Sequence, residues 1–464
     1  MLFSSPSFFI FLAVYFCFHL VVPKRHRIYL IICGSTIFYA RWKINHVWLP
    51  YLLMAIAYAG VRWINATEHR HTRKRRAIVT IVALFMPLLF FKYTDFVYAN
   101  IGTLIDGSGK LLDLPLPLGV SFITFTLTAY IVDIYRGKFP AAASPSTVLG
   151  YVLFFPHLIA GPILRPNELI PQLNRPLRTK ISRVAVPVII FTIGLVKKLI
   201  FSDQIADVVD RIYADGALLT GPAALLGVYG FSVQIYCDFS GYTDMAIGLA
   251  LLLGIHLPNN FAQPYCATSL VDFWRRWHIT LSLWLRDYLY IPLGGNREGR
   301  VKEVRNVLIT MALGGLWHGA NWTFVLWGIL HGIGVVVAHY AQRVLSFLGV
   351  QYLPRWVKLI ITFHFVTVAW IFFRAPDLDR AGKVFAAIFI GRWDGIATLL
   401  LENIFPVVLI AAMGLFHRFD DHRRFKFWVR RLRPEIVWPA ILLCWVLAIT
   451  VSQGNSAKFI YFDF

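Results

Sequence analysis

FWRRWHITLSLWLRDYLYIPLGGNR, at residues 273–297, is the most informative stretch of this 464-residue chain. It places arginines, aspartates and a histidine in a protein that is otherwise strongly apolar. A second histidine follows 40 residues after His278, at His318 in GGLWHGANWT, residues 314–323. Charge at membrane depth is costly enough to indicate that the residues carrying it have a task. The two histidines are therefore the first candidates for chemistry.

The composition is that of a polytopic membrane protein. Hydrophobic residues make up 58% of the chain and charged residues only 15%, which excludes an ordinary soluble globule. Ten apolar runs reach or approach membrane-crossing length: residues 8–22, 47–64, 77–91, 116–134, 184–195, 223–236, 322–339, 359–373, 405–416 and 436–451. We expect an all-α protein with ten or more spans, some entering the bilayer only part way. The period-two alternation of a β-barrel is not visible.

The net charge of +21 reflects membrane topology rather than nucleic-acid binding, because the basic residues fall in short loops between apolar runs. This is the positive-inside pattern. It places HRHTRKRR, residues 69–76, in the cytoplasm together with the basic runs at 165–183, 297–305 and 418–433. Both chain termini are then expected on the outside. The first apolar segment lacks the flanks of a cleaved signal peptide and is expected to be a retained anchor.

No polar interval is long enough to bury a core of its own, so we expect one membrane-embedded domain over residues 1–464. It divides into N-terminal helices (1–138), a catalytic core (139–345) and C-terminal helices (346–464). The core mixes apolar runs with Pro, Gly and charge, as in LPNNFAQPY at residues 257–265. Irregular backbone at membrane depth must be covered by protein or line a water-filled cavity. Half-entering helices around a polar funnel would satisfy that requirement.

Residues 269–288 have the periodicity of one amphipathic helix. Its apolar face would carry Phe273, Trp274, Trp277, Leu281, Trp284 and Tyr288, and its polar face Asp272, Arg275, Arg276, Arg286 and Asp287. His278 and Ser282 fall at the border between the faces, one turn apart. Two interpretations stay open: an interfacial helix without further function, or the wall of a polar cavity that His278 faces.

His318 lies between closely spaced glycines in GGLWHGANWTFVLWGILHG, residues 314–332. Gly315 with Gly319, and Gly328 with Gly332, form GxxxG pairs that let a second helix approach closely. If this segment is helical, His318 and Asn321 share a face. A histidine held neutral beside a polar partner can act as a general base. A packing histidine bonded to a carbonyl is the alternative.

Other chemistry has little support. The chain lacks a P-loop, HExxH, GxGxxG or complete GxSxG motif, and its cysteine and histidine spacing indicates no bound metal. Asp238 and Asp244, at the two ends of DFSGYTD, are each open to three interpretations: a helix cap, a cavity-lining residue or the partner of an arginine. His157 and His331 are interpreted as structural.

These motifs together resemble the membrane-bound O-acyltransferase family, in the branch that includes alginate O-acetyltransferases. The resemblance covers nearly the whole chain, including LPLGVSFITFTLTAYIVDIYRG (116–137), FFPHLIAGPILRP (154–166), QIYCDFSGYTDMAIGLALLLGI (234–255) and the closing FIYFDF. It implies a ring of tilted transmembrane helices, with re-entrant helices around a central tunnel, in a bacterial inner membrane with both termini periplasmic.

The resemblance also implies the reaction. The essential histidine of the family corresponds to His318 and its second histidine to His278, with Asn321, Trp317, Arg275, Arg276, Trp277, Ser282 and Asp238 expected along the donor and acceptor tunnel. No cofactor is expected to stay bound. Acetyl-CoA would donate from the cytoplasm, His318 would act as the base, and a periplasmic SGNH-type acetyltransferase partner would complete transfer to a polysaccharide such as alginate. Arg275 and Arg276 would contact donor phosphates or, alternatively, only solvate the helix surface.

Three other functions remain to be separated from this one. The acceptor could be cellulose, another exopolysaccharide or a cell-wall polymer. The chain could be a transporter or flippase, although it lacks the internal repeat typical of many transporters. It could also be a non-catalytic platform for a periplasmic enzyme.

Overall fold

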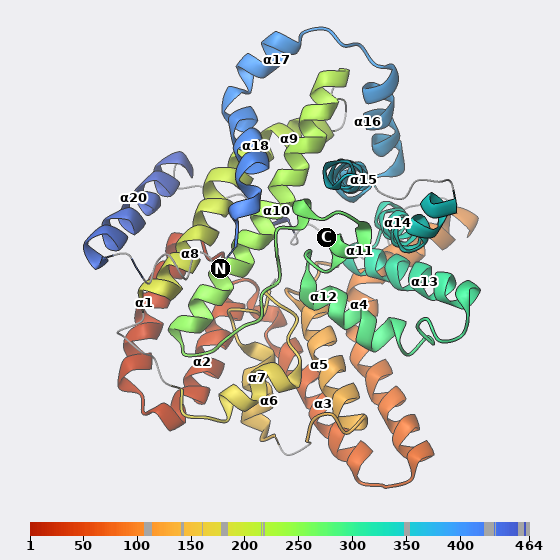
Figure 1. Cartoon of the computed structure of the whole chain (residues 1–464). Helices are drawn as coiled ribbons and strands as arrows, with labels where there is room; N and C mark the ends of the chain where they lie inside the picture. The colour runs from red at the N-terminus through yellow and green to blue at the C-terminus, as the bar shows by residue number, and fades with distance from the viewer. Residues whose placement is uncertain are drawn as a thin grey trace. The chain divides into compact units, whose positions relative to one another are not determined.

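A computed structural model describes residues 1–105, 114–140, 143–159, 161–177, 184–214, 216, 219–347, 353–421, 431, 433–452 and 459–460. The regular structure of these residues is helical, without a strand (Figure 1), which confirms the predicted all-α class. Parts of the basic runs at 165–183 and 418–433, and the last four residues of FIYFDF, lie outside the described residues.

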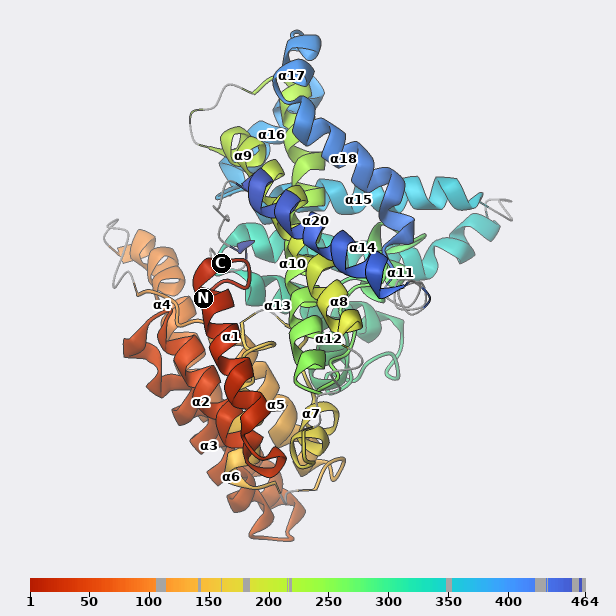
Figure 2. The same cartoon turned by 90° about the vertical axis from the view of Figure 1, so that its left-hand side faces the viewer.

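Six helices of the described chain are long and apolar enough to cross a membrane. A seventh span results if α17 (Ile396–Glu402) and the segment Ile404–Phe419, bent by 88° relative to each other, are counted together. Figure 2 shows α18 (Ile404–Phe416) running away from α17 at this bend. The described residues thus contain six or seven segments of full membrane-crossing length, and the ten or more predicted spans, some of which enter only part way, stay a prediction. Two of the predicted runs form the shorter helices α1 (Pro6–Val21) and α5 (Val120–Tyr135), below the roughly 20 residues that a bilayer requires.

The described residues separate into two compact units. The first comprises Met1–Phe191 with Met245–Pro258, and the second comprises Thr192–Asp244 with Asn259–Phe464. The first unit groups α1 to α5 as a bundle (Figure 2). Within this bundle, α2 spans Arg27–Ala40, α3 spans Trp48–Asn65 and α4 spans Arg70–Ile105; the unit also contains α6 (Pro145–Leu153) and α7 (Pro166–Leu173). The prediction of one domain with three parts stays a prediction.

The second unit holds both candidate histidines. Its helices are α9 (Asp203–Tyr213), α11 (Leu270–Trp274), α12 (Ile279–Leu285), α13 (Arg300–His318), α14 (Trp322–Phe347), α15 (Arg355–Arg374), α16 (Leu378–Ile390), α17, α18 and α20 (Pro434–Ser452). Two long elements, α8 (Ala185–Val196) and α10 (Gly221–Leu252), contribute residues to both units. A wide π-helical turn, Lys197–Ser202, joins α8 to α9.

The hairpin of α13 and α14 positions His318. The two helices lie side by side (Figure 1), and glycine makes their close contact possible. A Cβ on Gly315 would overlap the Phe324 carbonyl, and one on Gly328 would overlap the Met311 carbonyl. The GxxxG prediction of close helix approach is therefore confirmed for Gly315 and Gly328. His318 is the last residue of α13, at the tip of this hairpin.

Candidate active site

The predicted helix over residues 269–288 is broken at His278. Ser269 caps α11 by accepting a hydrogen bond from the Asp272 N–H, and α12 begins only after His278. His278 has φ 40° and ψ 54°, the left-handed region that few residues other than glycine enter. A single helix cannot continue through that conformation. The prediction of one continuous helix is wrong, because the hydrophobic period runs on across the break and hides it.

The break turns His278 into the protein. Phe273, Trp277, Leu281 and Trp284 are buried, and Arg275 and Arg286 are exposed, as the predicted amphipathic partition requires. His278, however, is 0% exposed, whereas the prediction placed it at the border between the apolar and polar faces. Its ring lies 4.6 Å from that of Phe239, centroid to centroid. An imidazole in this position needs polar partners from the protein interior.

Asn260 supplies those partners and accounts for the break. Its side-chain oxygen accepts hydrogen bonds from the Thr280 N–H at 3.1 Å and from Thr280 Oγ1 at 2.9 Å, and it lies 3.2 Å from His278 Nδ1. Its main-chain oxygen accepts from the Ile279 N–H at 2.9 Å. Asn260 thus caps α12 from a distant segment. The sequence analysis singled out LPNNFAQPY but missed this residue, because nothing in the segment distinguishes Asn260 from the adjacent Asn259.

The Asn260 contact sets the tautomer of His278. Because Asn260 Oδ1 already accepts from a main-chain N–H, it is an oxygen acceptor, so His278 Nδ1 carries the hydrogen and donates it. Nε2 then presents a lone pair. This atom is buried and has no hydrogen-bond partner among the described residues. Burial lowers the pKa of His278 to about 3, so the ring is neutral at physiological pH and Nε2 can accept a proton or a hydrogen bond.

Trp317 lies between the two histidines. Its ring centroid is 6.3 Å from that of His278 and 5.0 Å from that of His318. His318 is 3% exposed and also contacts Trp327 and Phe373, each at 5.2 Å between ring centroids. The structure therefore brings His278, Trp317 and His318 into one buried cluster, although His278 and His318 are far apart in the chain.

Asn321 does not share a helical face with His318. The chain leaves α13 at Gly319, whose backbone is extended, and α14 starts at Trp322. Asn321 donates from Nδ2 to the Pro376 carbonyl at 2.8 Å, and its Oδ1 accepts from the Thr323 N–H at 3.1 Å. Both ends of its side chain are thus engaged with backbone. The condition under which His318 and Asn321 would share a face is a helix through both residues, and it is not met, because the glycine after the histidine ends the helix.

The remaining predicted tunnel residues around the break have different environments. Trp277 is 1% exposed and packs on Phe273 and Trp370. Arg276 forms an ion pair with Asp272 at 2.8 Å, and Ser282 Oγ donates to the Trp277 carbonyl at 3.3 Å. Arg275 is exposed. Of this group, Arg275 is the residue best placed to meet an anionic group from outside.

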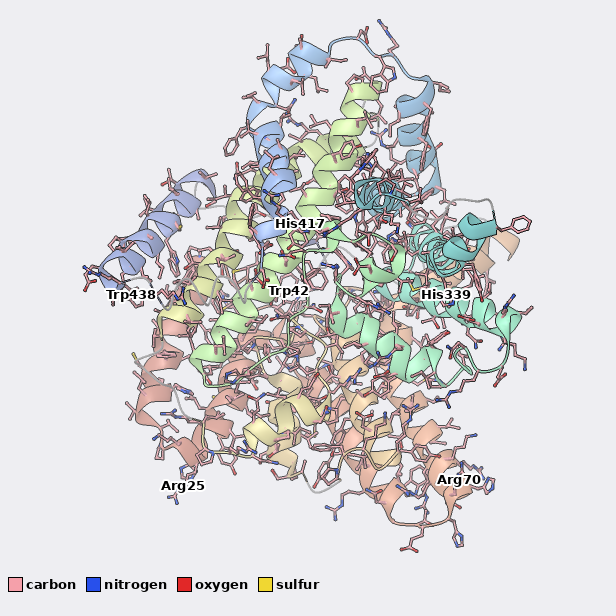
Figure 3. The ribbon with its side chains drawn as sticks, in the orientation of Figure 1. Arg25, Trp42, Arg70, His339, His417 and Trp438 are labelled. Atoms are coloured by element: carbon pink, nitrogen blue, oxygen red, sulfur yellow. The ribbon has the colours of Figure 1, made fainter. Side chains whose placement is uncertain are left out.

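Asp238 belongs to a buried ion-pair network rather than to an arginine pair. Two successive lysines of the π-helical turn each bridge two carboxylates, at 2.6 to 2.9 Å: Lys197 with Asp244 and Asp420, and Lys198 with Asp203 and Asp238. The second Asp238 oxygen accepts from the Ile460 N–H at 2.7 Å. Tyr236 donates to Asp420 at 2.6 Å, and its ring lies edge-on to that of His417, 4.7 Å between centroids. His417, which directly follows α18, is labelled in Figure 3. The sequence analysis missed both lysines.

A cavity of about 520 Å³ lies between α11–α12 and the α13–α14 hairpin. Apolar side chains of all four helices form most of its wall, among them Ile279, Val307, Met311 and Val335. Polar side chains also line it: Arg275, Ser282, Arg286, Asn296, Glu303, His339 and Tyr340. His339, on α14, is labelled in Figure 3. The cavity can hold an amphipathic molecule with a charged end.

Several known proteins similar to this chain are named for O-acetyl transfer. The profile of MBOAT, the membrane-bound O-acyltransferase family, matches residues 141–375. The chain is 38% identical over 434 residues to the probable alginate O-acetylase AlgI of Azotobacter vinelandii, covering 89% of this chain and 85% of the relative. It is 40% identical over 404 residues to the protein of the same name from Pseudomonas aeruginosa, covering 85% and 76%. It is 37% identical over 422 residues to the peptidoglycan O-acetyltransferase of Helicobacter pylori, covering 83% and 79%.

Proposed function

The chain belongs to the membrane-bound O-acyltransferase family and is a multi-pass membrane O-acyltransferase, and we propose that it transfers acetyl groups from cytoplasmic acetyl-CoA toward an exported polysaccharide such as alginate. The names of the similar proteins, two of them probable alginate O-acetylases, support an acetyl group and a polymeric acceptor. The observation that carries the proposal is the buried cluster of His278, Trp317 and His318.

In the proposed reaction His318 is the general base. The acceptor hydroxyl oxygen attacks the thioester carbonyl carbon, and His318 takes the hydroxyl proton as the new C–O bond forms. The C–S bond then breaks, and the proton passes from His318 to the departing thiolate. A base positioned in this way raises the rate of such a transfer about 10²- to 10⁴-fold. Atoms and charge balance without a metal or a redox cofactor.

His278 is proposed to hold the reacting groups rather than to compete with His318. With Nδ1 donating to Asn260, its Nε2 lone pair can accept a hydrogen bond from the acceptor hydroxyl or relay its proton. Trp317 and Trp277 provide an apolar wall that excludes water from the thioester. Asn321 fixes the backbone next to His318, and Asp238 with Lys198 holds α10 in place behind Phe239.

The cavity beside Arg275 is proposed as the entrance for the donor. Its lining includes Asn296, which directly precedes the basic run at 297–305 that the charge pattern assigns to the cytoplasm. Arg275 is exposed and lines this cavity, where it can contact donor phosphates. Arg276, already paired with Asp272, is proposed to support Arg275 rather than to bind phosphate itself.

The proposed setting is a bacterial inner membrane with the donor inside and the acceptor outside. The N- and C-termini would be periplasmic, and CoA would stay in the cytoplasm. A periplasmic acetyltransferase of the SGNH type would accept the acetyl group and modify the polymer. The same chemistry would serve another exopolysaccharide, cellulose or a cell-wall polymer, and the likeness to a peptidoglycan O-acetyltransferase keeps the last of these open.

Replacement of His318 tests this function. Cells carrying His318→Ala, with protein amounts equal to wild type, should secrete polymer without O-acetyl groups, measured by mass analysis of the purified polysaccharide. His157→Gln is the matched control, because His157 is equally buried but bonds the Tyr151 carbonyl in the first unit. Retained acetylation in the His318→Ala strain would refute His318 as the base and favour a platform role. Acetyl groups on peptidoglycan instead of a secreted polymer would change the acceptor alone.

A further inference from the structure

His331 is a third buried histidine near the site, and its surroundings are aromatic. It is 0% exposed, and its ring lies 4.7 Å from Trp327, 5.2 Å from Trp274 and 5.9 Å from Phe273, centroid to centroid. Phe365 and Trp370 complete the box at 6.0 and 6.2 Å. The sequence analysis treated His331 as structural, but neither of its ring nitrogens has a hydrogen-bond partner among the described residues.

A purely structural role does not explain why an imidazole, and not an apolar ring, occupies this aromatic box. A neutral histidine carries one donor and one acceptor, and leaving both unsatisfied in the interior destabilises the protein, whereas phenylalanine would fill a similar space without that penalty. The indole N–H groups of Trp274 and Trp327 are likewise buried without a partner among the described residues. The rings of His331, Trp274 and Trp327 therefore offer hydrogen-bond donors and an acceptor that no described residue uses.

These rings lie between the cavity and His318. His339, Val335, His331 and Trp327 are spaced four residues apart and so follow one face of α14. His339 and Val335 line the cavity, and Trp327 contacts His318 at 5.2 Å. The face from position 339 to position 327 is about 18 Å long at 1.5 Å per residue. Trp274 also lines the cavity and contacts both His331 and Trp327.

We propose that His331 and Trp274 form a hydrogen-bonding station for the amide-containing pantetheine arm of the acyl donor. This inference rests on the proposed function, because it assumes a thioester donor entering through the cavity. In this arrangement the nucleotide phosphates stay near Arg275. The pantetheine arm passes Trp274 and runs along the face of α14 that carries His331 and Trp327. His331 binds an amide of the arm, and the acetyl group reaches His318 beyond Trp327. His331 is thus a residue for donor recognition and not for proton transfer.

Donor kinetics of the full-length protein in lipid nanodiscs test the station. Release of free thiol from acetyl-CoA gives kcat and KM, and pantetheine and adenosine 3′,5′-bisphosphate serve as inhibitors that resemble the two ends of CoA. His331→Phe should raise the KM for acetyl-CoA and the inhibition constant of pantetheine about three- to tenfold, the size of one neutral hydrogen bond. Its kcat and its inhibition by the bisphosphate should stay within about twofold. His331→Gln, which keeps a donor and an acceptor, should restore the wild-type KM.

Controls separate recognition from packing. Phe365→Leu alters the same box without removing a hydrogen-bonding group, so it should leave pantetheine inhibition unchanged. Trp274→Phe removes the indole N–H together with some ring volume, whereas Phe365→Leu removes ring volume alone, so comparing these two variants tests the inference if His331→Phe does not fold. Unchanged pantetheine inhibition in folded His331→Phe or Trp274→Phe overturns the inference, and so does equal weakening of the bisphosphate. If wild type releases no thiol from acetyl-CoA, the proposed donor itself is wrong.

Discussion

Asn260 controls which nitrogen of His278 is available for chemistry. One oxygen serves three donors, from the His278 ring, the Thr280 main chain and the Thr280 hydroxyl. The amide therefore shapes the backbone and selects the tautomer at the same time. A histidine without this anchor could expose either nitrogen to a substrate, and only one of them would carry the lone pair.

The first prediction concerns this amide. Asn260→Ala should lower acetyl transfer about 10- to 100-fold, part of the contribution that a positioned acid or base makes. It should also reduce stability by about 1–3 kcal/mol, because the Thr280 N–H is left buried and unsatisfied. Acetyl-CoA turnover and thermal unfolding in nanodiscs measure the two effects.

Asn260→Asp is the matched control. The carboxylate keeps an acceptor for all three donors, so the variant should retain more stability than Asn260→Ala. A nearby negative charge favours the protonated ring and raises the pKa of His278, so activity should be lost at a higher pH on acidification than in wild type. Wild-type activity in Asn260→Ala would show that the tautomer of His278 does not matter.

At the scale of elements, the α13–α14 hairpin carries His318 at its tip, so its packing decides where that imidazole lies. Gly328 has the Met311 carbonyl where a Cβ would stand. Backbone cannot move aside as a flexible side chain can. Gly328→Ala should therefore push the two helices apart and displace His318 relative to Trp317.

We predict that Gly328→Ala lowers stability by about 1–3 kcal/mol, the usual effect of overpacking, and lowers turnover more than donor affinity. The control is Gly382→Ala on α16, where an added Cβ meets nothing within 4 Å. That change should be neutral or stabilising by up to about 1 kcal/mol, because alanine favours helix. Thermal midpoints and turnover of both variants provide the measurement. Equal behaviour of the two variants would contradict close packing at Gly328.

The π-helical turn Lys197–Ser202 poses a different energetic problem. It holds two lysines against four carboxylates in the interior, and such pairs stabilise a protein little but are costly to break. Lys198→Met should destabilise by about 3–5 kcal/mol, because Asp203 and Asp238 remain buried without this cation.

Lys302→Met is the comparison for that prediction. Lys302 pairs with Glu298 at 2.9 Å, but both side chains are about half exposed, and exposed pairs contribute at most about 1 kcal/mol. Yield and thermal midpoint should fall for Lys198→Met and stay near wild type for Lys302→Met. A Lys198→Met protein as stable as wild type would mean that the network is dispensable for folding.

At the scale of the whole molecule, patterns carried by neighbouring residues were predictable from sequence. The all-α class, the aromatic face of residues 269–288 and the close approach at Gly315 and Gly328 all follow from local periodicity or spacing. Features that depend on residues far apart in the sequence were not predictable in this way. Asn260 acts on a residue 18 positions away, and Lys198 pairs with Asp238 across a longer interval, so hydrophobic period and motif spacing gave no signal for either.

The same limit applies to the number of spans, because hydropathy measures apolar length and not helix continuity. The bent pair Ile396–Glu402 and Ile404–Phe419 is a broken span or a re-entrant loop. The two differ in where residues 391–395 lie. With the basic run at 418–433 in the cytoplasm, a broken span places these residues outside, and a re-entrant loop places them inside.

We predict a broken span, and with it an exterior loop around Asp394. In a cysteine-free background, Asp394→Cys should react with a membrane-impermeant maleimide in intact spheroplasts, because the side chain is 58% exposed. Thr72→Cys, within HRHTRKRR, should react only after the membrane is permeabilised. Protection of Asp394→Cys until permeabilisation would identify a re-entrant loop, whereas labelling of Thr72→Cys in intact spheroplasts would invert the predicted topology. Under that inversion the cavity beside Arg275 would open away from cytoplasmic acetyl-CoA, so this labelling also decides whether the donor can reach His318 by the proposed route.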